Sequence, residues 1–513
     1  MSRPRISTGS VFFPGRRRAD APPLRSADDA LHMAVIGDFS GRGSRGEEQL
    51  EELPRRRAFE IDRDNFDAVF ARLDVRLQLP FEERPLALRE IDDLHPDVLL
   101  EQLDLFSEFR RLQRQLRSRD GFDRAAAEIR GWAGGTDRDD GAAAPAPAQE
   151  RADAAPPEDL FDAVLSESRE QADAAMQSAG NVNRLIQAIV APYIEPRENP
   201  ERARYQAALD EAMAQALRRI MHSGAFQRLE ANWRALQLLV SRLETDPQLK
   251  LFLLDVSQQE LLDDAINADS VEDMALCRRL LQEQEVPGAT PFAVLNVELV
   301  IDDDIDRLRL AAALGQIAER SGSLAVCSAS GHLAGCADLG AREDVDDWDY
   351  AVDETTLAGW QAYRDDSSAR HLIACAPRFL VRLPYGRRGE AIEHFPFEEL
   401  GGERRHEYYC WAPGAYLLTL ALGQAFSLGG WAELLGGVSE IEEMPVHVYT
   451  DDDGDSCAMP CAEVFLRDPA AEALAKVGIC SLRSIRGRDA VAIPHKRSVH
   501  RSGEIASVVP RGV

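Results

Sequence analysis

A glycine-rich segment near the N-terminus, IGDFSGRGSRG from Ile36 to Gly46, is the first place where this sequence could support chemistry. It follows an apolar run, which is where a phosphate-binding loop stands relative to its strand. However, it lacks the Gly-Lys-Ser/Thr sequence that holds phosphate and magnesium, and its glycines do not follow the GxGxxG spacing. We therefore interpret the segment as a structural turn and not as a nucleotide site.

Alternating aspartates form a second candidate, because Asp451, Asp453 and Asp455 have the spacing that begins a calcium-binding loop. Such a loop requires glycine at its sixth position and a glutamate at its twelfth. Here the glycine is the fourth residue and Ala462 is the twelfth. An acidic surface turn is the better interpretation.

A third candidate is the pair Cys457 and Cys461, with His447 upstream. Zinc would need a fourth ligand and usually a closer cysteine pair, so these residues are interpreted as loop and core thiols. Neither HExxH nor GxSxG occurs in the sequence. The sequence therefore predicts no catalytic residue, no metal site and no cofactor, and the chain is expected not to be an enzyme. An enzyme assembled from distant residues stays an alternative.

Composition narrows the possible partners. The chain has 513 residues, with 59 Lys or Arg against 88 Asp or Glu, so its formal net charge is −29. So acidic a chain repels phosphate backbones, and nucleic acid is not expected as a partner. The eight scattered cysteines indicate buried, reduced thiols. Because no apolar segment reaches the roughly 20 residues that span a bilayer, we expect a cytoplasmic protein without direct membrane insertion.

The elements that would position any site follow from hydrophobic periodicity. Apolar runs of strand length stand at residues 249–256, 292–300, 323–329 and 371–376, and helical spacing covers 305–320 between two of them. Strands that are apolar on both faces and alternate with helices predict a sheet covered by helices, with at least partly parallel pairing. The fold class is therefore α/β, with mixed α+β character.

Weaker patterns extend this prediction toward both ends of the chain. Organised sequence begins with a strand at Leu31, and apolar spacing predicts single helices over 96–117 and 415–428. Ser257 and Glu260 form a capping box that begins a helix. Later segments are predicted to be strands at 445–449 and 462–467 and a short helix at 471–476.

Composition also divides the chain. Residues 133–159 are rich in Ala, Pro, Gly and charged residues, without a large apolar side chain, which is typical of a linker. The predicted organisation is a flexible tail at 1–30, a small α/β module at 31–132, this linker, a larger α/β module at 160–483 and a C-terminal tail at 484–513.

The small module resembles the small subunit of the bacterial type VI secretion contractile sheath, and the large module resembles the large subunit. For the small subunit the similar segments are residues 34–42 (AVIGDFSGR), 55–79 and 91–100 (IDDLHPDVLL). For the large subunit they are residues 222–240, 376–386 (APRFLVRLPYG), 408–422, 436–449 and 462–482. The chain thus looks like both subunits fused, in the order small then large.

This resemblance implies a structural function. The two subunits of the family form an intertwined heterodimer that stacks into a helical tube around an inner tube. Contraction expels the inner tube, and a ring-shaped ATPase recycles the sheath. The implied partners are further copies or other sheath subunits, and beyond them the inner-tube protein, the baseplate and the ATPase.

Two departures keep an alternative open. The large subunit of the family normally continues well past the region matching 462–482, and the small subunit continues past the position of Arg119. A non-polymerising adaptor or regulator made of truncated sheath domains is therefore the alternative.

Three residues are expected at an interface. Arg378 and Arg382 would share one side of an extended segment and meet carboxylates, either within the chain or on a neighbouring subunit. Trp411 belongs to a cluster with Tyr408 and Tyr409, which is interpreted as core or interface, with stacking on a ligand as the weaker possibility.

Overall fold

The structure, a computed structural model, describes residues 25–133 and 202–509 except residues 27, 81, 83, 119–120, 285–289, 402–404 and 451–452. A seven-stranded sheet lies at its centre, with the strand order β14-β8-β7-β6-β1-β5-β2. Neighbouring strands are parallel, except that β2 is antiparallel to β5 at one edge. The strands are β1 (Leu31–Gly37), β2 (Phe59–Ile61), β5 (Leu249–Asp255), β6 (Phe292–Ile301), β7 (Leu324–Ala329), β8 (Leu372–Ala376) and β14 (Ile479–Ser481). The predicted α/β fold with largely parallel pairing is confirmed.

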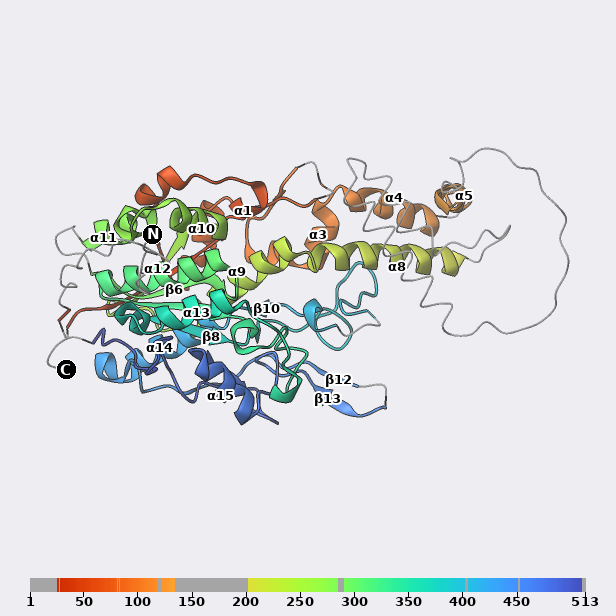
Figure 1. Ribbon diagram of the computed structural model, residues 1–513. Coiled ribbons are helices and arrows are strands. Elements are labelled where there is room, and N and C mark those ends of the chain that lie inside the picture. The colour runs from red at the N-terminus through yellow and green to blue at the C-terminus, as the bar shows by residue number, and fades with distance from the viewer. Residues whose placement is uncertain are drawn as a thin grey trace, which may run out of the picture.

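Helices cover both faces of this sheet (Figure 1). Successive residues of a strand point to opposite faces, so Met33 and Val35 pack with α9 and α14, whereas Ala34 and Ile36 pack with α10 and α12. This two-sided burial explains why the strands are apolar throughout. The covering helices are α9 (Gly224–Arg242), α10 (Gln258–Asn267), α11 (Ala275–Gln284), α12 (Ile305–Ser321), α13 (Glu354–Tyr363), α14 (Ala415–Glu433) and α15 (Asp468–Lys476).

A second group of helices extends away from the sheet. It contains α3 (Pro96–Gln102), α4 (Leu105–Arg117), α5 (Phe122–Ala133) and α8 (Arg202–Met221). The helix α2 (Phe66–Arg72) instead contacts the edge strand β2. In Figure 1, α4 and α5 lie near α8 at the end of the molecule farthest from the sheet, and α8 contacts α4. The sequence predicts one helix over 96–117, whereas the structure has α3 and α4. Leu103 is buried with an extended backbone between them, so apolar spacing continues through the break and hides it.

Short elements complete the fold. They are α1 (Arg42–Arg45), the pair β3 (Arg76–Leu77) and β4 (Leu86–Ala87), the pair β9 (Phe379–Leu380) and β10 (Trp411–Ala412), and the hairpin β12 (Val448–Thr450) with β13 (Ser456–Ala458). A three-stranded sheet has the order β11 (Glu440–Ile441), β16 (Val491–Ala492) and β15 (Arg483–Ser484).

Two expectations for the C-terminal part differ from the structure. The strand predicted over 462–467 is a turn and irregular segment, since the Val464 amide bonds back to the Ala462 carbonyl. Its alternating apolar residues are buried without strand pairing, so the alternation indicated burial alone. The tail predicted from residue 484 is instead packed into the body up to residue 509. Val491 and Val499 are fully buried, but such residues are spaced too widely to form a recognisable period.

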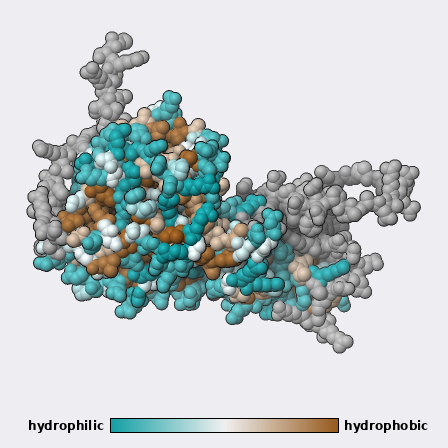
Figure 2. All heavy atoms as spheres, turned by 90° about the horizontal axis from the view of Figure 1, so that it is seen from below, coloured by the Kyte–Doolittle hydropathy of each residue, from teal (hydrophilic) through white to brown (hydrophobic). Residues whose placement is uncertain are grey.

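Surface and cysteines agree with a folded, acidic protein. The face seen in Figure 2 is mostly hydrophilic, with apolar side chains gathered in scattered patches. Seven of the eight cysteines are buried free thiols, and Cys457 is half-buried. Across the described residues, no helix is both long and apolar enough to cross a membrane.

The predicted linker lies almost wholly outside the described residues, since only Ala133, the last residue of α5, falls within them. The same holds for residues 1–24 of the predicted N-terminal tail. The division into modules therefore stays a prediction. In the described part, however, β1 from residues 25–133 lies inside a sheet whose other long strands all come from residues 202–509.

Candidate functional site: the joint between the two segments

The contact surface between residues 25–133 and residues 202–509, here called the joint, is centred on β1. This strand lies between β5 and β6, and pairs in parallel from Leu31 opposite Leu249 to Gly37 opposite Asp255. Its other edge pairs with β6, for example Val35 opposite Asn296. Because both edges of β1 are hydrogen-bonded to the later segment, the sheet is continuous only when the two segments fold together.

An aromatic cluster packs beside the strand. The Trp233 side chain from α9 is fully buried against Phe39, Phe66 and Phe70, with ring-centroid distances of 5.2, 5.6 and 4.3 Å. Its indole Nε1 donates a hydrogen bond of 2.8 Å to the Phe39 carbonyl. A large buried ring with its polar atom satisfied contributes strongly to such a contact.

Ion pairs close the carboxyl-end side of the joint. Arg42 contacts Asp255 at 3.1 Å and Glu260 at 3.0 Å, and Arg56 contacts Glu260 at 2.9 Å. Burial alone would raise the pKa of Glu260, but hydrogen bonds from Arg56 and from two backbone amides lower it to about 2. The predicted capping box of Ser257 and Glu260 is confirmed, and the same glutamate also binds the earlier segment.

The glycine-rich turn after β1 already has its amide donors occupied. Asp38 accepts hydrogen bonds of 2.9 Å from the amides of Arg42 and Gly43, the groups that a phosphate would otherwise use. The turn is thus held by its own carboxylate, in agreement with the structural interpretation.

A pair of half-buried carboxyl groups lies at the same place. The Asp38 amide donates to Glu298 Oε2 at 2.7 Å, and both side chains line a cavity of about 360 Å³ with Arg228 and Arg307. Burial and the nearby Asp255 raise the pKa of Asp38 to about 6. Burial and Asp38 raise the pKa of Glu298 to about 7.

A further contact across the joint involves the first turn of α3. Asp97 lies 2.7 Å from His394 Nδ1 and accepts a hydrogen bond of 2.9 Å from the Glu393 amide. Burial alone would raise the pKa of Asp97, but the hydrogen bonds from the Glu393 amide and from His394 lower it.

Arg382, the first expected interface residue, lies in an internal ion-pair cluster with Glu230 and Glu399. Its guanidinium is 2.7 Å from each of these carboxylates, and the three side chains are 9%, 0% and 1% exposed. Burial alone would raise the pKa of Glu230, but Arg382 and Arg234 lower it to about 2. All three residues belong to the later segment, residues 202–509, so this cluster is not part of the joint. It connects α9 to the loop that contains Glu399.

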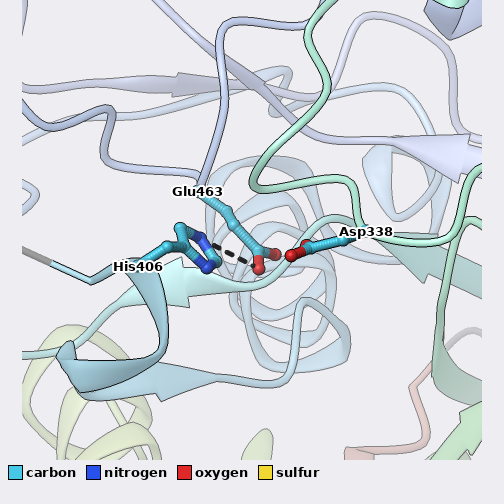
Figure 3. A group of neighbouring side chains, drawn as sticks. All are labelled: Asp338, His406 and Glu463. Carbon is cyan, nitrogen blue, oxygen red and sulfur yellow. Dashed lines mark ion pairs between the residues drawn. The ribbon is translucent and has the colours of Figure 1, made fainter. Parts of the chain in front are cut away.

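Arg378 and Trp411 both contact a different cluster, formed by Asp338, His406 and Glu463. Figure 3 shows these three side chains. Arg378 binds the buried carboxylate of Glu463, whose other neighbours are His406 Nε2 at 3.2 Å and Asp338. Trp411 is buried, stacks on His406 at 5.0 Å and donates from Nε1 to the His406 carbonyl at 2.8 Å.

Asp338, His406 and Glu463 are close enough to share a cation, with ligand atoms within 4.8 Å of one another. The guanidinium and the amide of Arg378 already bind both oxygens of Glu463, so the carboxylate has a positive partner within the chain. The cluster is therefore understood as an ion-pair network. These residues are far apart in the sequence, and no spacing could have indicated that they meet.

Among the described residues, the cysteine pair and the aspartate segment considered in the sequence analysis do not belong to either cluster. Cys457 is in β13, while Cys461 is buried outside it. His447 Nδ1 is 2.9 Å from the Tyr409 hydroxyl, and Tyr409 packs in a small core with Trp411. Asp451 lies outside the described residues.

The joint places this chain in a class of α/β proteins in which two separate segments complete one sheet. Ion pairs connect the two segments. Residues 203–500 match the family described as EvpB/VC_A0108, tail sheath N-terminal domain (VipB), and this match covers more than half of the chain. The chain therefore belongs to the VipB tail sheath family. Residues 28–121 match the family described as Type VI secretion system, VipA, VC_A0107 or Hcp2. Both resemblances noted in the sequence are confirmed.

A curated relative supports the same family. The chain is 28% identical over 305 residues to the type VI secretion system sheath protein TssC1 of Pseudomonas aeruginosa. The similar region is 58% of this chain and 61% of that protein, so the chain spans about three fifths of the length of this relative.

Proposed function

We propose that the chain is a structural subunit of a type VI secretion sheath or sheath-like assembly, which packs around an inner tube for protein secretion. In this proposal the two matched segments act as a heterodimer within one chain. The observation that carries it is the position of β1, between β5 and β6 of the later segment. Such an arrangement cannot form unless the segments associate, and covalent fusion raises their effective concentration.

The proposal includes a cytoplasmic location and no catalysis. Its partners would be further copies or other sheath subunits, and then the inner-tube protein, the baseplate and the sheath-recycling ATPase. The family is structural, and Arg42 and Arg56 of the joint are paired with carboxylates within the chain, which supports a mechanical function. Purified protein is expected to show no nucleotide hydrolysis above background.

Electron microscopy of the full chain tests the proposal most directly. Negative-stain images and sedimentation velocity, with and without an inner-tube protein, should show rings, filaments or tubes. A protein that stays monomeric under all these conditions and does not join sheath subunits would contradict it.

Limited proteolysis tests the heterodimer within one chain. Because residues 133–159 lack large apolar side chains, we expect the first cleavage there, with the two fragments still eluting together on gel filtration. Fragments that separate without denaturant would contradict the idea that the joint holds the segments together.

A further inference from the structure

Basic side chains gather on one surface of this acidic chain, between the end of α13, the helix α15 and residues 496–501. A shallow hollow of about 380 Å³ lies there and is here called the basic hollow. It is lined by Gln361, Arg364, Glu472, Ala475, Lys476, Arg497 and Arg501. A neighbouring hollow of about 420 Å³ shares Glu472, Ala475 and Arg497 with it.

Some of the positive charge around the basic hollow is neutralised within the chain. Arg501 pairs with Asp365 at 2.6 Å. Nearby, Arg483 pairs with Asp468 at 2.7 Å, so these two arginines have carboxylate partners.

Three other cations that line the basic hollow have no carboxylate within 4.0 Å among the residues that the structure describes. They are Arg364, Lys476 and Arg497. Glu472 is the single carboxylate that lines the hollow. The described surroundings thus carry an excess of positive charge, although the whole chain has a net charge of −29.

The contacts of Arg364 and Arg497 show that no carboxylate of the described residues neutralises the charge of these two arginines. Arg364 is 3% exposed and donates to backbone carbonyls, with Nε 2.8 Å from the Val499 carbonyl. Burial, together with the charges of Arg497 and Arg501, lowers the pKa of Arg364 to about 10. The Nε atom of Arg497 is buried and has no hydrogen-bond partner among the described residues.

We propose that the basic hollow is a docking site for carboxylate side chains on a second copy of this chain. This inference rests on the proposed function, because it names one contact through which copies would assemble. Charge complementarity favours a second copy as the occupant. Two copies of a chain with a net charge of −29 repel each other overall, so a local basic surface offers an attractive contact. Arginine forks match carboxylates in two-point geometry.

A charge-reversal experiment on the full chain tests this. Lys476→Glu combined with Arg497→Glu reverses the two lining cations whose side chains make no hydrogen bond or ion pair with another described residue. Arg387→Glu combined with Arg486→Glu is the matched control, because it changes the net charge equally at side chains that are 77% and 70% exposed. Self-association is measured by sedimentation velocity at low and at high salt.

The hollow variant is expected to need about tenfold more protein for assembly at low salt than the control, with a thermal transition like that of the wild type. High salt should weaken wild-type assembly and narrow this difference. If the double glutamate variant does not fold, Lys476→Gln with Arg497→Gln takes its place.

Equal assembly of hollow variant and control would overturn the inference and leave the proposed function standing. So would an equal loss in both, because net charge would then be the cause. A wild-type chain that never self-associates would contradict the inference, and the proposed function as well if the chain also fails to join other sheath subunits.

Discussion

Carboxylates occur in two very different settings in this molecule, one buried and one half-buried. Around Arg382, Glu230 and Glu399 are almost completely buried, and each lies 2.7 Å from a guanidinium. Beside the turn after β1, Asp38 and Glu298 are held together mainly by backbone amides and have no cation within 4.0 Å among the described residues.

The pKa values separate the two settings. The pKa of Glu230 falls to about 2, although burial opposes this, because two arginines favour its charged form. The pKa of Glu298 rises to about 7, because burial and Asp38 disfavour the charge. Burial by itself therefore does not decide whether an acid stabilises this fold; the presence of a cation does.

Removing the cation of the first cluster should have the largest effect. Arg382→Ala leaves Glu230 and Glu399 buried and unpaired, so we expect a loss of about 3–5 kcal/mol in the free energy of unfolding at pH 7. Urea unfolding followed by circular dichroism measures it. Arg387→Ala, at a side chain that is 77% exposed, is the control and should leave stability unchanged.

The same variant bears on the interface predicted for Arg382. An unchanged unfolding transition combined with a loss of assembly would assign Arg382 to a contact between subunits. A variant that both unfolds and assembles like the wild type would show that Arg382 is a solvated surface charge.

The second-largest effect should be the loss at low pH of the stability that the Arg382 cluster contributes. Since the folded-state pKa of Glu230 is about 2 and its ordinary value is 4.5, its stabilising contribution is complete above pH 4.5 and is lost as the pH falls toward 2. The loss should be on the order of 3 kcal/mol. Glu230→Gln should flatten this acid limb in urea midpoints measured from pH 7 to 2.5, whereas the exposed-site control Glu52→Gln should not. Parallel limbs for all three proteins would contradict the lowered pKa.

The sequence predicts the secondary structure of the fold better than it predicts the contacts of the joint. The four apolar runs and the capping box at Ser257 are local patterns, and each formed the predicted element. Strand pairing is different, because nothing in the composition of residues 31–37 states that this strand enters between two strands more than 200 positions later. The family resemblance implied an association of the two segments, but not this register.

The partners in the ion pairs could not be predicted from the sequence. Glu230 and Arg382 are separated by 152 positions, and Glu230 occurs on a helix among ordinary polar residues. Arg378 and Arg382 both meet carboxylates, as expected, but in two different clusters, since β9 ends at Leu380. Local spacing predicts on which side of an extended segment a charged side chain lies. The identity of its partner depends on how segments distant in the sequence pack together.

The smallest expected effect concerns the second setting and has the opposite sign. Glu298 has a folded-state pKa of about 7, above its ordinary 4.5, so its charge destabilises the fold fully above pH 7, and that cost disappears as the pH falls toward 4.5. Glu298→Gln keeps an oxygen for the Asp38 amide and removes the charge. At pH 8 it should stabilise the protein by about 1 kcal/mol, because the cavity beside Glu298 lets water screen part of the repulsion. At pH 5 the gain should vanish. Glu230→Gln is the matched control, since the same substitution at a paired acid should destabilise at pH 8. If both variants shift the urea midpoint in the same direction at pH 8, the presence of a cation is not what separates the two settings.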